Sequence, residues 1–130
     1  MKKTTVLMMS LAAFTLTACS GATLPEKGAV SAFDGIWEGT LPGKPKNAAD
    51  CSGITLQGEV RFGHLVASIY QKKKDMGDVW GEIGTDGKLI GNVGALGIQA
   101  GTANVVFTET TASGDWDSPA CTGTLQIAKK

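Results

Sequence analysis

Histidine is almost absent from this chain of 130 residues, which has only His64, and aromatic residues make up just 6% of it. Several catalytic motifs are missing as well: there is no Gly-x-Ser-x-Gly, no glycine-rich phosphate loop and no Cys-x-x-Cys pair. Zinc sites need clustered cysteine and histidine, which this chain does not have. We therefore expect no metal and no cofactor, and we predict that the protein is not an enzyme.

An excess of charge is also lacking, since 12 basic residues balance 12 acidic ones. Nucleic-acid-binding domains carry basic patches, and the only run of three basic residues here is Lys72-Lys73-Lys74. We therefore expect no nucleic-acid partner. No helical period of useful length follows Cys19, which leaves strands and turns as the elements to look for.

The N-terminus has the features of an export signal. Lys2 and Lys3 precede an apolar run over residues 6–16, which is too short to span a bilayer as a permanent helix. The next four residues, Leu16-Thr17-Ala18-Cys19, resemble the lipobox of bacterial lipoproteins. The resemblance implies that residues 1–18 are a lipoprotein signal peptide that is removed, and that Cys19 is the lipid anchor, carrying fatty-acyl chains such as palmitate.

The alternative is an ordinary secretory signal cut after Thr17-Ala18, with Cys19 incidental. In the lipobox interpretation Ser20 follows the cysteine in place of an aspartate, and the resemblance then implies anchoring in the bacterial outer membrane. The membrane is thus the first expected partner, through the lipid on Cys19. Loss of Lys2 and Lys3 would leave ten basic residues against twelve acidic ones.

The cysteine count supports the lipobox interpretation. Three cysteines are an odd number for an exported protein, and an acylated Cys19 leaves Cys51 and Cys121 as a pair. A disulfide is the default state of such a pair in an oxidising compartment. It would stabilise the fold by about 4 kcal/mol on the chain-entropy model. Two buried free thiols are the alternative.

Eighteen glycines and alternating apolar residues indicate many short strands. We expect residues 19–32 to form a flexible tether and residues 33–130 to form one domain. Its predicted strands cover residues 33–41, 54–60, 65–71, 77–84, 88–94, 104–109, 110–117 and 121–127. The fold class is therefore all-β, either an antiparallel up-and-down barrel, avidin-like or lipocalin-like, or a small sandwich of about seven or eight strands, with one disulfide.

The connections are less uniform than the strands. Residues 42–50 contain two prolines and two lysines and read as a loop, and Asp86-Gly87 reads as a hairpin turn. A bulge is expected at Gly58. The glycine-broken, apolar residues 94–101 fit a loop, a wide turn or the start of a strand equally well.

Candidate contact residues are few. Tyr70 with Lys72, Lys73 and Lys74 could meet phosphates of an anionic lipid or lipopolysaccharide, although a solvated loop is the simpler interpretation. Trp37 and Trp116 are expected in the core. Trp80 falls on the opposite face from Val79 and Ile83, which makes it a candidate partner or ligand contact.

Catalytic interpretations have little support. His64 next to Gly63 could act as a general base, but a turn histidine usually points to solvent. Carboxylate pairs could serve an envelope hydrolase, although any soluble β surface shows such pairs; the carboxylates concerned are Asp34, Glu38, Asp78, Glu82, Asp115 and Asp117.

Three segments, Phe33-Asp34-Gly35-Ile36-Trp37, Ala112-Ser113-Gly114-Asp115-Trp116 and Cys121-Thr122-Gly123-Thr124-Leu125, resemble those of small exported bacterial β-barrel proteins. In outline the chain is similar to avidin-like and lipocalin-like barrels, to barrel domains of surface lipoproteins and to small periplasmic inhibitors of metalloproteases. We expect a lipid-anchored envelope module that binds an envelope protein, a glycan or a small apolar ligand, or supports an assembly. The alternatives are a protease inhibitor and a carboxylate-dependent hydrolase.

Overall fold

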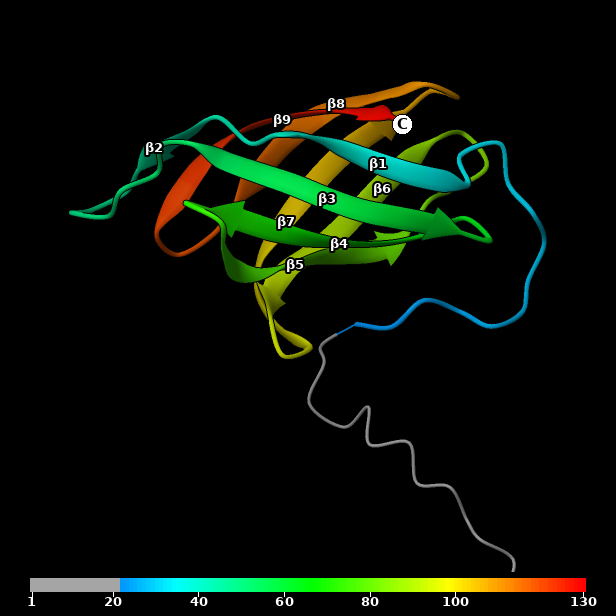
Figure 1. The fold of residues 1–130 in the computed structure, drawn as a ribbon, viewed down its shortest axis with the longest axis horizontal. Helices are drawn as coiled ribbons and strands as arrows, with labels where there is room; N and C mark the ends of the chain where they lie inside the picture. Colours follow the sequence, from blue (N-terminus) through cyan, green and yellow to red (C-terminus); the bar gives the residue numbers. More distant parts are fainter. Residues whose placement is uncertain (1–21) are drawn as a thin grey trace, which may run out of the picture.

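The computed structural model describes residues 22–130, so the expected signal peptide and Cys19 lie outside the described residues. The described residues form a closed antiparallel β-barrel without a helix (Figure 1). In chain order its strands are β1 (Gly35–Thr40), β2 (Gly43–Pro45), β3 (Ile54–Arg61), β4 (His64–Gln71), β5 (Lys74–Glu82), β6 (Lys88–Ala95), β7 (Ile98–Phe107), β8 (Thr111–Asp117) and β9 (Cys121–Lys129).

The barrel closes because β1 pairs with two strands that are far apart in sequence. The sheet order is β1-β3-β4-β5-β6-β7-β8-β9, and the far side of β1 then pairs with β9, with Gly39 opposite Ile127. Eight strands make the closed wall, and β2 adds a short ninth strand beside β9. Of the two predicted architectures, the barrel is confirmed. Closure leaves no long free edge in the wall, and such an edge would pair with other chains.

Alternation along the strands decides which side chains fill the barrel. In β4, for example, Leu65, Ala67 and Ile69 are buried, while the residues between them are partly exposed. The same holds for Val79 in β5 and Leu89 in β6, as the sequence predicted. Trp37 is fully buried and Trp116 nearly so, which confirms both as core residues. Apolar burial of this kind is the main stabilising contribution to such a fold.

Of two inward-facing glycines, one has the role that the sequence predicted and the other does not. Gly81 behaves as predicted: a Cβ there would lie 2.8 Å from the Leu89 side chain, so its absence makes room for a large neighbour. The predicted bulge at Gly58 is wrong, because β3 pairs with β4 in continuous register and Gly58 lies directly opposite Ala67. A side chain at Gly58 would collide with Ala67, so the glycine permits close packing. The bulges lie at Ile69/Tyr70 and at Val93/Gly94.

The expected loop at residues 42–50 contains β2, which pairs with the start of β9. Thr40 pairs with Gln126 and Gly43 with Gly123, so the register along β9 continues unchanged across Leu41 and Pro42. Pro42 has no amide hydrogen to give, but its carbonyl accepts the amide of Thr124 at 3.0 Å. β2 therefore continues the line of β1 along β9.

The ambiguous residues 94–101 also have a clear structure. β6 runs to Ala95, a turn follows at Leu96 and Gly97, and β7 begins at Ile98. Both turn residues have positive φ, 55° and 74°, as a two-residue hairpin of this kind requires. The hairpin extends beyond the neighbouring strands, as its yellow tip in Figure 1 shows.

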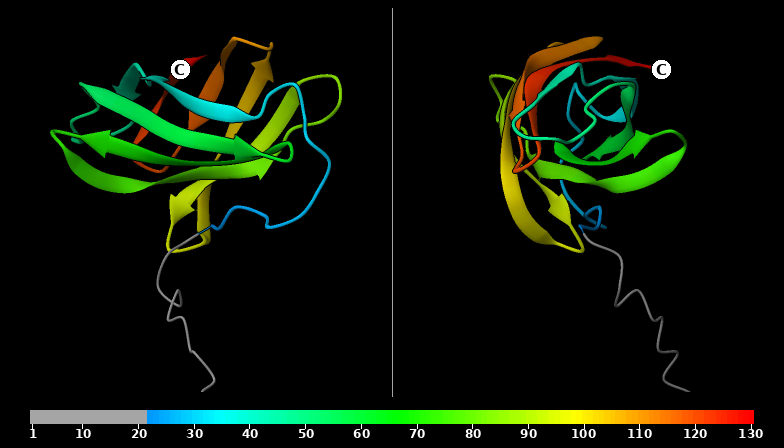
Figure 2. Two further views of the ribbon diagram at one scale, coloured as in Figure 1. Left: turned by 45° about the vertical axis from the view of Figure 1, so that its right-hand side comes forward. Right: turned by 90° about the vertical axis from the view of Figure 1, so that its left-hand side faces the viewer.

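The chain preceding β1 closes one end of the barrel. Residues 22–34 contain no strand and run along the outside to this end (Figure 2). There the Asp34 carboxylate accepts the amides of Phe62 and Gly63 in the β3–β4 turn, at 3.0 and 2.9 Å. The Trp37 indole donates to the Phe33 carbonyl at 2.8 Å, which holds this segment against the core.

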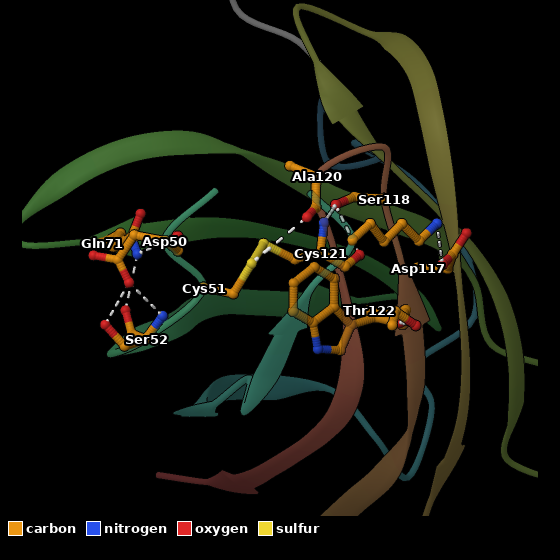
Figure 3. Close-up of a disulfide and its surroundings, with 11 residues drawn as sticks. Asp50, Cys51, Ser52, Gln71, Asp117, Ser118, Ala120, Cys121 and Thr122 are labelled. Carbon is orange, nitrogen blue, oxygen red and sulfur yellow. Dashed lines mark hydrogen bonds and ion pairs between the residues drawn. A yellow bond between two sulfur atoms is a disulfide. The ribbon is translucent and has the colours of Figure 1, made fainter. Parts of the chain in front are cut away.

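The disulfide lies at the other end (Figure 3). Cys51 and Cys121 are bonded, with 6.0 Å between their Cα atoms, which confirms the predicted pair. The bond joins the loop before β3 to the first residue of β9. Gln71 holds the same loop by donating to the carbonyls of Asp50 and Ser52, both at 2.9 Å.

Candidate functional site

The barrel interior is filled by one continuous apolar cluster, so the surface is the place to look for a site. A hollow of about 940 Å³ lies over the outer face of β1 and β3 and reaches the ends of β4 and β9. Its lining consists of Glu38, Gly39, Thr40, Gly53, Thr55, Leu56, Gln57, Tyr70, Lys72, Lys73, Ala128, Lys129 and Lys130. We call this hollow the β1–β3 groove.

The floor of the β1–β3 groove is polar because it is the outward row of the alternating strands. Glu38 of β1 lies opposite Gln57 of β3, and Thr40 lies opposite Thr55. Thr55 in turn lies opposite Tyr70 of β4, which contributes an aromatic wall. Hydroxyl, amide and aromatic groups thus lie side by side on neighbouring strands.

The rim of the β1–β3 groove is predominantly basic. Lys72 and Lys73 approach it from the β4–β5 turn, and Lys129 and Lys130 from the end of β9, against one lining carboxylate, Glu38. Lys130 lies 3.9 Å from Glu38, and this ion pair is solvent-exposed. Because four lysines line the groove against this one carboxylate, the rim keeps an excess of positive charge.

The rim lysines differ in how they are held. Lys129 Nζ donates to the Ala32 carbonyl at 2.9 Å and lies 5.6 Å from the Trp37 ring centroid, so it helps to close the barrel end. Lys72 lies 3.5 Å from the exposed Asp50 carboxylate. Among the described residues Lys73 has no acidic partner within salt-bridge distance, which leaves its ammonium group available to a ligand.

The turn that carries Lys72 and Lys73 adopts a backbone that lysine disfavours. Both residues have positive φ, 52° and 63°. The comparable turns place glycine second, at Gly63 after Phe62 and at Gly97 after Leu96. A left-handed conformation costs a residue with a side chain about 1 kcal/mol or more, and such strain concentrates at functional positions. Two lysines there suggest a role beyond closing the turn.

The structure brings together three of the five predicted contact residues, Tyr70, Lys72 and Lys73. Lys74 opens β5 opposite Gln71 and does not line the groove. Trp80 lies on the outer face of β5 between Val66 and Asn92, half-buried, and is separate from the groove. Its expected outward orientation is confirmed.

Sequence reasoning missed Lys129 and Lys130, and it considered Glu38 only as a catalytic carboxylate. The two lysines reach the groove because β1 pairs with β9, and that pairing joins the two ends of the domain. Local alternation carries no information about it. The general expectation that a small barrel closes its first strand on its last is the one signal that could have found them.

The groups considered for catalysis are dispersed. His64 is half-buried opposite Glu82, in a second hollow between the barrel end and residues 25–33. Among the described residues that line this hollow, Glu82 is the only aspartate or glutamate. The Asp34 carboxylate accepts hydrogen bonds from the β3–β4 turn, and Asp117 forms an exposed ion pair with Lys46 at 2.6 Å. No described carboxylate pair faces His64.

One outward carboxylate has an unusual environment. Burial raises the pKa of Asp78 above its ordinary value of 3.8, the charge of Asp75 raises it further, and a hydrogen bond from Ser68 opposes both. Asp78 lies opposite Ser68 on β4 and Gly94 on β6, without a histidine or a second acid in direct register. Its position gives no basis for a catalytic pair.

Within residues 22–130 no group of three or more histidine, cysteine, aspartate or glutamate side chains could hold a metal ion. None of these residues belongs to a helix of the length and apolarity that a membrane span requires. Comparison with protein-family models, curated proteins and solved structures found no match. The surface of the barrel and the N-terminal sequence of the chain are therefore the features that bear on its function.

Proposed function

We propose that this chain is a non-catalytic, lipid-anchored binding module of the bacterial cell envelope, and that the β1–β3 groove holds an anionic glycan. The observation that carries the proposal is the composition of the groove. Lysines surround a floor of threonine, glutamine and tyrosine side chains. Hydroxyl and amide groups hydrogen-bond to sugar hydroxyls, an aromatic ring packs against a sugar face, and lysine attracts carboxylate or phosphate groups.

The lipid anchor is the second part of the proposal, and it rests on Leu16-Thr17-Ala18-Cys19. The disulfide between Cys51 and Cys121 supports it, because it accounts for two of the three cysteines and leaves Cys19 as the third. Such pairs form in oxidising compartments outside the cytoplasm. Intact-mass measurement of the membrane fraction should show Cys19 acylated and residues 1–18 absent. An unmodified mass would contradict the anchor.

Binding of cell-wall fragments tests the groove. Fragments released by muramidase carry free carboxylates, and chitin oligosaccharides offer a related sugar backbone without them. Titration calorimetry should show binding of the first and little of the second. Replacing Lys72 and Lys73 by glutamine should weaken binding about tenfold or more, since hydrogen bonds to charged groups contribute about 1.5–3 kcal/mol each.

The matched control is Lys88→Gln, which removes an exposed lysine of β6 far from the groove. It should leave binding unchanged. Equal binding of charged and neutral fragments, or an equal loss in the control, would contradict the groove as the site. Capture of a protease in the absence of glycan binding would instead favour the inhibitor alternative.

A further inference from the structure

The β6–β7 hairpin carries an exposed apolar surface that the groove does not use. Seven large apolar residues are exposed in residues 22–130, and four of them lie on this hairpin. Leu96 and Ile98, at the tip, are 72% and 71% exposed, and Ile90 and Val106 lie further along its outer face. Clustered exposed apolar residues mark contact surfaces more often than scattered ones do.

The hairpin is also nearly free of charge. From Gly87 to Thr108 there is no acidic residue, and Lys88 is the only basic one. Met76, 54% exposed, is adjacent in sequence to Gly77, which lies against Gly94 and Ala95 at the base of the tip. The neighbouring strands place Asp78 opposite Gly94 and Asp117 opposite Thr102, so the nearest carboxylates lie at the flanks of the hairpin and not at its tip. A tip with apolar residues and without carboxylates suits a bilayer, whose headgroups repel negative charge and whose acyl chains accept apolar side chains.

The path of the N-terminal segment brings this surface to the proposed anchor. In all three views of Figures 1 and 2 the blue beginning of the described chain lies beside the yellow tip of the hairpin. Cys19 precedes Ala22 by three residues, which span at most about 11 Å. Acyl chains on Cys19 therefore enter a bilayer that passes close to Leu96 and Ile98.

We propose that the tip of the β6–β7 hairpin inserts Leu96 and Ile98 into the phospholipid surface that holds the lipid on Cys19. The inference rests on the lipid anchor of the proposed function. The barrel then has two attachments to the membrane, one covalent and one formed by side chains. Because the first is covalent, the second acts at high local concentration and does not need to be strong.

Two attachments fix the orientation of the barrel. In a closed wall of eight strands ordered β1-β3-β4-β5-β6-β7-β8-β9, β6 lies four places from β1, and β7 lies four places from β3. The β1–β3 groove is therefore on the side of the barrel away from the bilayer. A ligand in the groove comes from the space between membranes or from the cell wall, and not from the anchoring leaflet.

Site-specific photocrosslinking of the lipidated full-length protein tests the inference. A benzoylphenylalanine replaces Leu96 in one variant and Thr85, in the exposed turn at the opposite end of the barrel, in the other. Both proteins are reconstituted in vesicles of phosphatidylethanolamine and phosphatidylglycerol, irradiated and analysed by mass. Phospholipid adducts should form severalfold more at residue 96 than at residue 85. Both positions are exposed, so the substitutions leave the core unchanged.

The outcomes separate the two proposals. Acylated protein without a lipid adduct at residue 96 would overturn the hairpin contact and leave the anchor intact. Protein that lacks the acyl mass would overturn the anchor and the hairpin contact together. An adduct at residue 96 with a second copy of the chain, or with a copurified envelope protein, would assign this surface to a protein partner instead. A further variant carries Leu96→Asn and Ile98→Asn. On vesicles, its hairpin amides should be less protected from hydrogen exchange than those of the wild type. The protection of the amides in β1 and β3 should be unchanged.

Discussion

Asp34 joins two parts of the chain that are far apart in sequence. Its carboxylate accepts the Ser31 hydroxyl and amide and the amides of Phe62 and Gly63, so one side chain secures both the N-terminal segment and the β3–β4 turn. Burial raises the pKa of Asp34, but these hydrogen bonds outweigh it and hold the pKa below its ordinary value of 3.8. The charged form is thus stabilised by folding.

Replacing Asp34 by asparagine should lower the free energy of unfolding at pH 7 by about 1–2 kcal/mol, because charged hydrogen-bond acceptors are lost. The wild-type advantage is fully present above pH 3.8 and disappears as pH falls through the lower folded pKa. Chemical denaturation followed by circular dichroism, at pH 7 and at pH 2.5, measures both values. Asp115→Asn, an exposed change, is the control. A difference between wild type and Asp34→Asn that persists at low pH would contradict this role.

At the level of elements, the two-residue turns are similar in backbone but differ in sequence. The β3–β4 and β6–β7 turns have glycine second, whereas the β4–β5 turn has Lys72 and Lys73, both with positive φ. Asparagine and glycine are the preferred residues for such turns. The β4–β5 turn therefore gives up local stability for two cations at the rim of the β1–β3 groove.

Lys72→Asn with Lys73→Gly should raise the free energy of unfolding by about 1–2 kcal/mol, because the new residues tolerate positive φ. The same variant should bind the acidic glycan fragments at least about tenfold more weakly. Thermal unfolding and calorimetric titration of one preparation measure the two effects. A second variant, Lys72→Gln with Lys73→Gln, separates the effect of the charges on binding from the effect of the backbone on stability. It should lose binding without gaining stability. A stabilised variant that binds normally would show that the lysines have no ligand role.

The sequence predicted strands well where burial imposes alternation, as in β4 and β9, because each inward position must be apolar. It missed β2 because Lys44 and Pro45 are exposed and the strand is held by pairing with β9. Residues 94–101 remained ambiguous because Leu96 and Ile98 are apolar but point to solvent, which breaks the alternation. Only part of the groove could be predicted from the sequence, because Lys129 and Lys130 line it through the pairing of β1 with β9.

Across the whole molecule, two links join the beginning of the domain to its end. The pairing of β1 with β9 closes the wall, and the Cys51–Cys121 disulfide ties the loop before β3 to the start of β9. The bond spans 70 residues, more than half of the described chain. Domains of this size have an unfolding free energy of only about 5–15 kcal/mol, so a constraint of this length contributes a large share.

Replacing Cys51 and Cys121 by serine should lower the free energy of unfolding by about 4 kcal/mol, because the unfolded chain regains the entropy of an open loop. The barrel should still close, since β1 and β9 pair without the bond and the other residues of the apolar core are unchanged. Denaturation in urea with and without reductant measures the effect: wild type should fall to the value of the variant when reduced, while the variant should not respond. Wild-type stability that is unchanged after complete reduction, verified by thiol labelling, would show that strand pairing alone holds the two ends together.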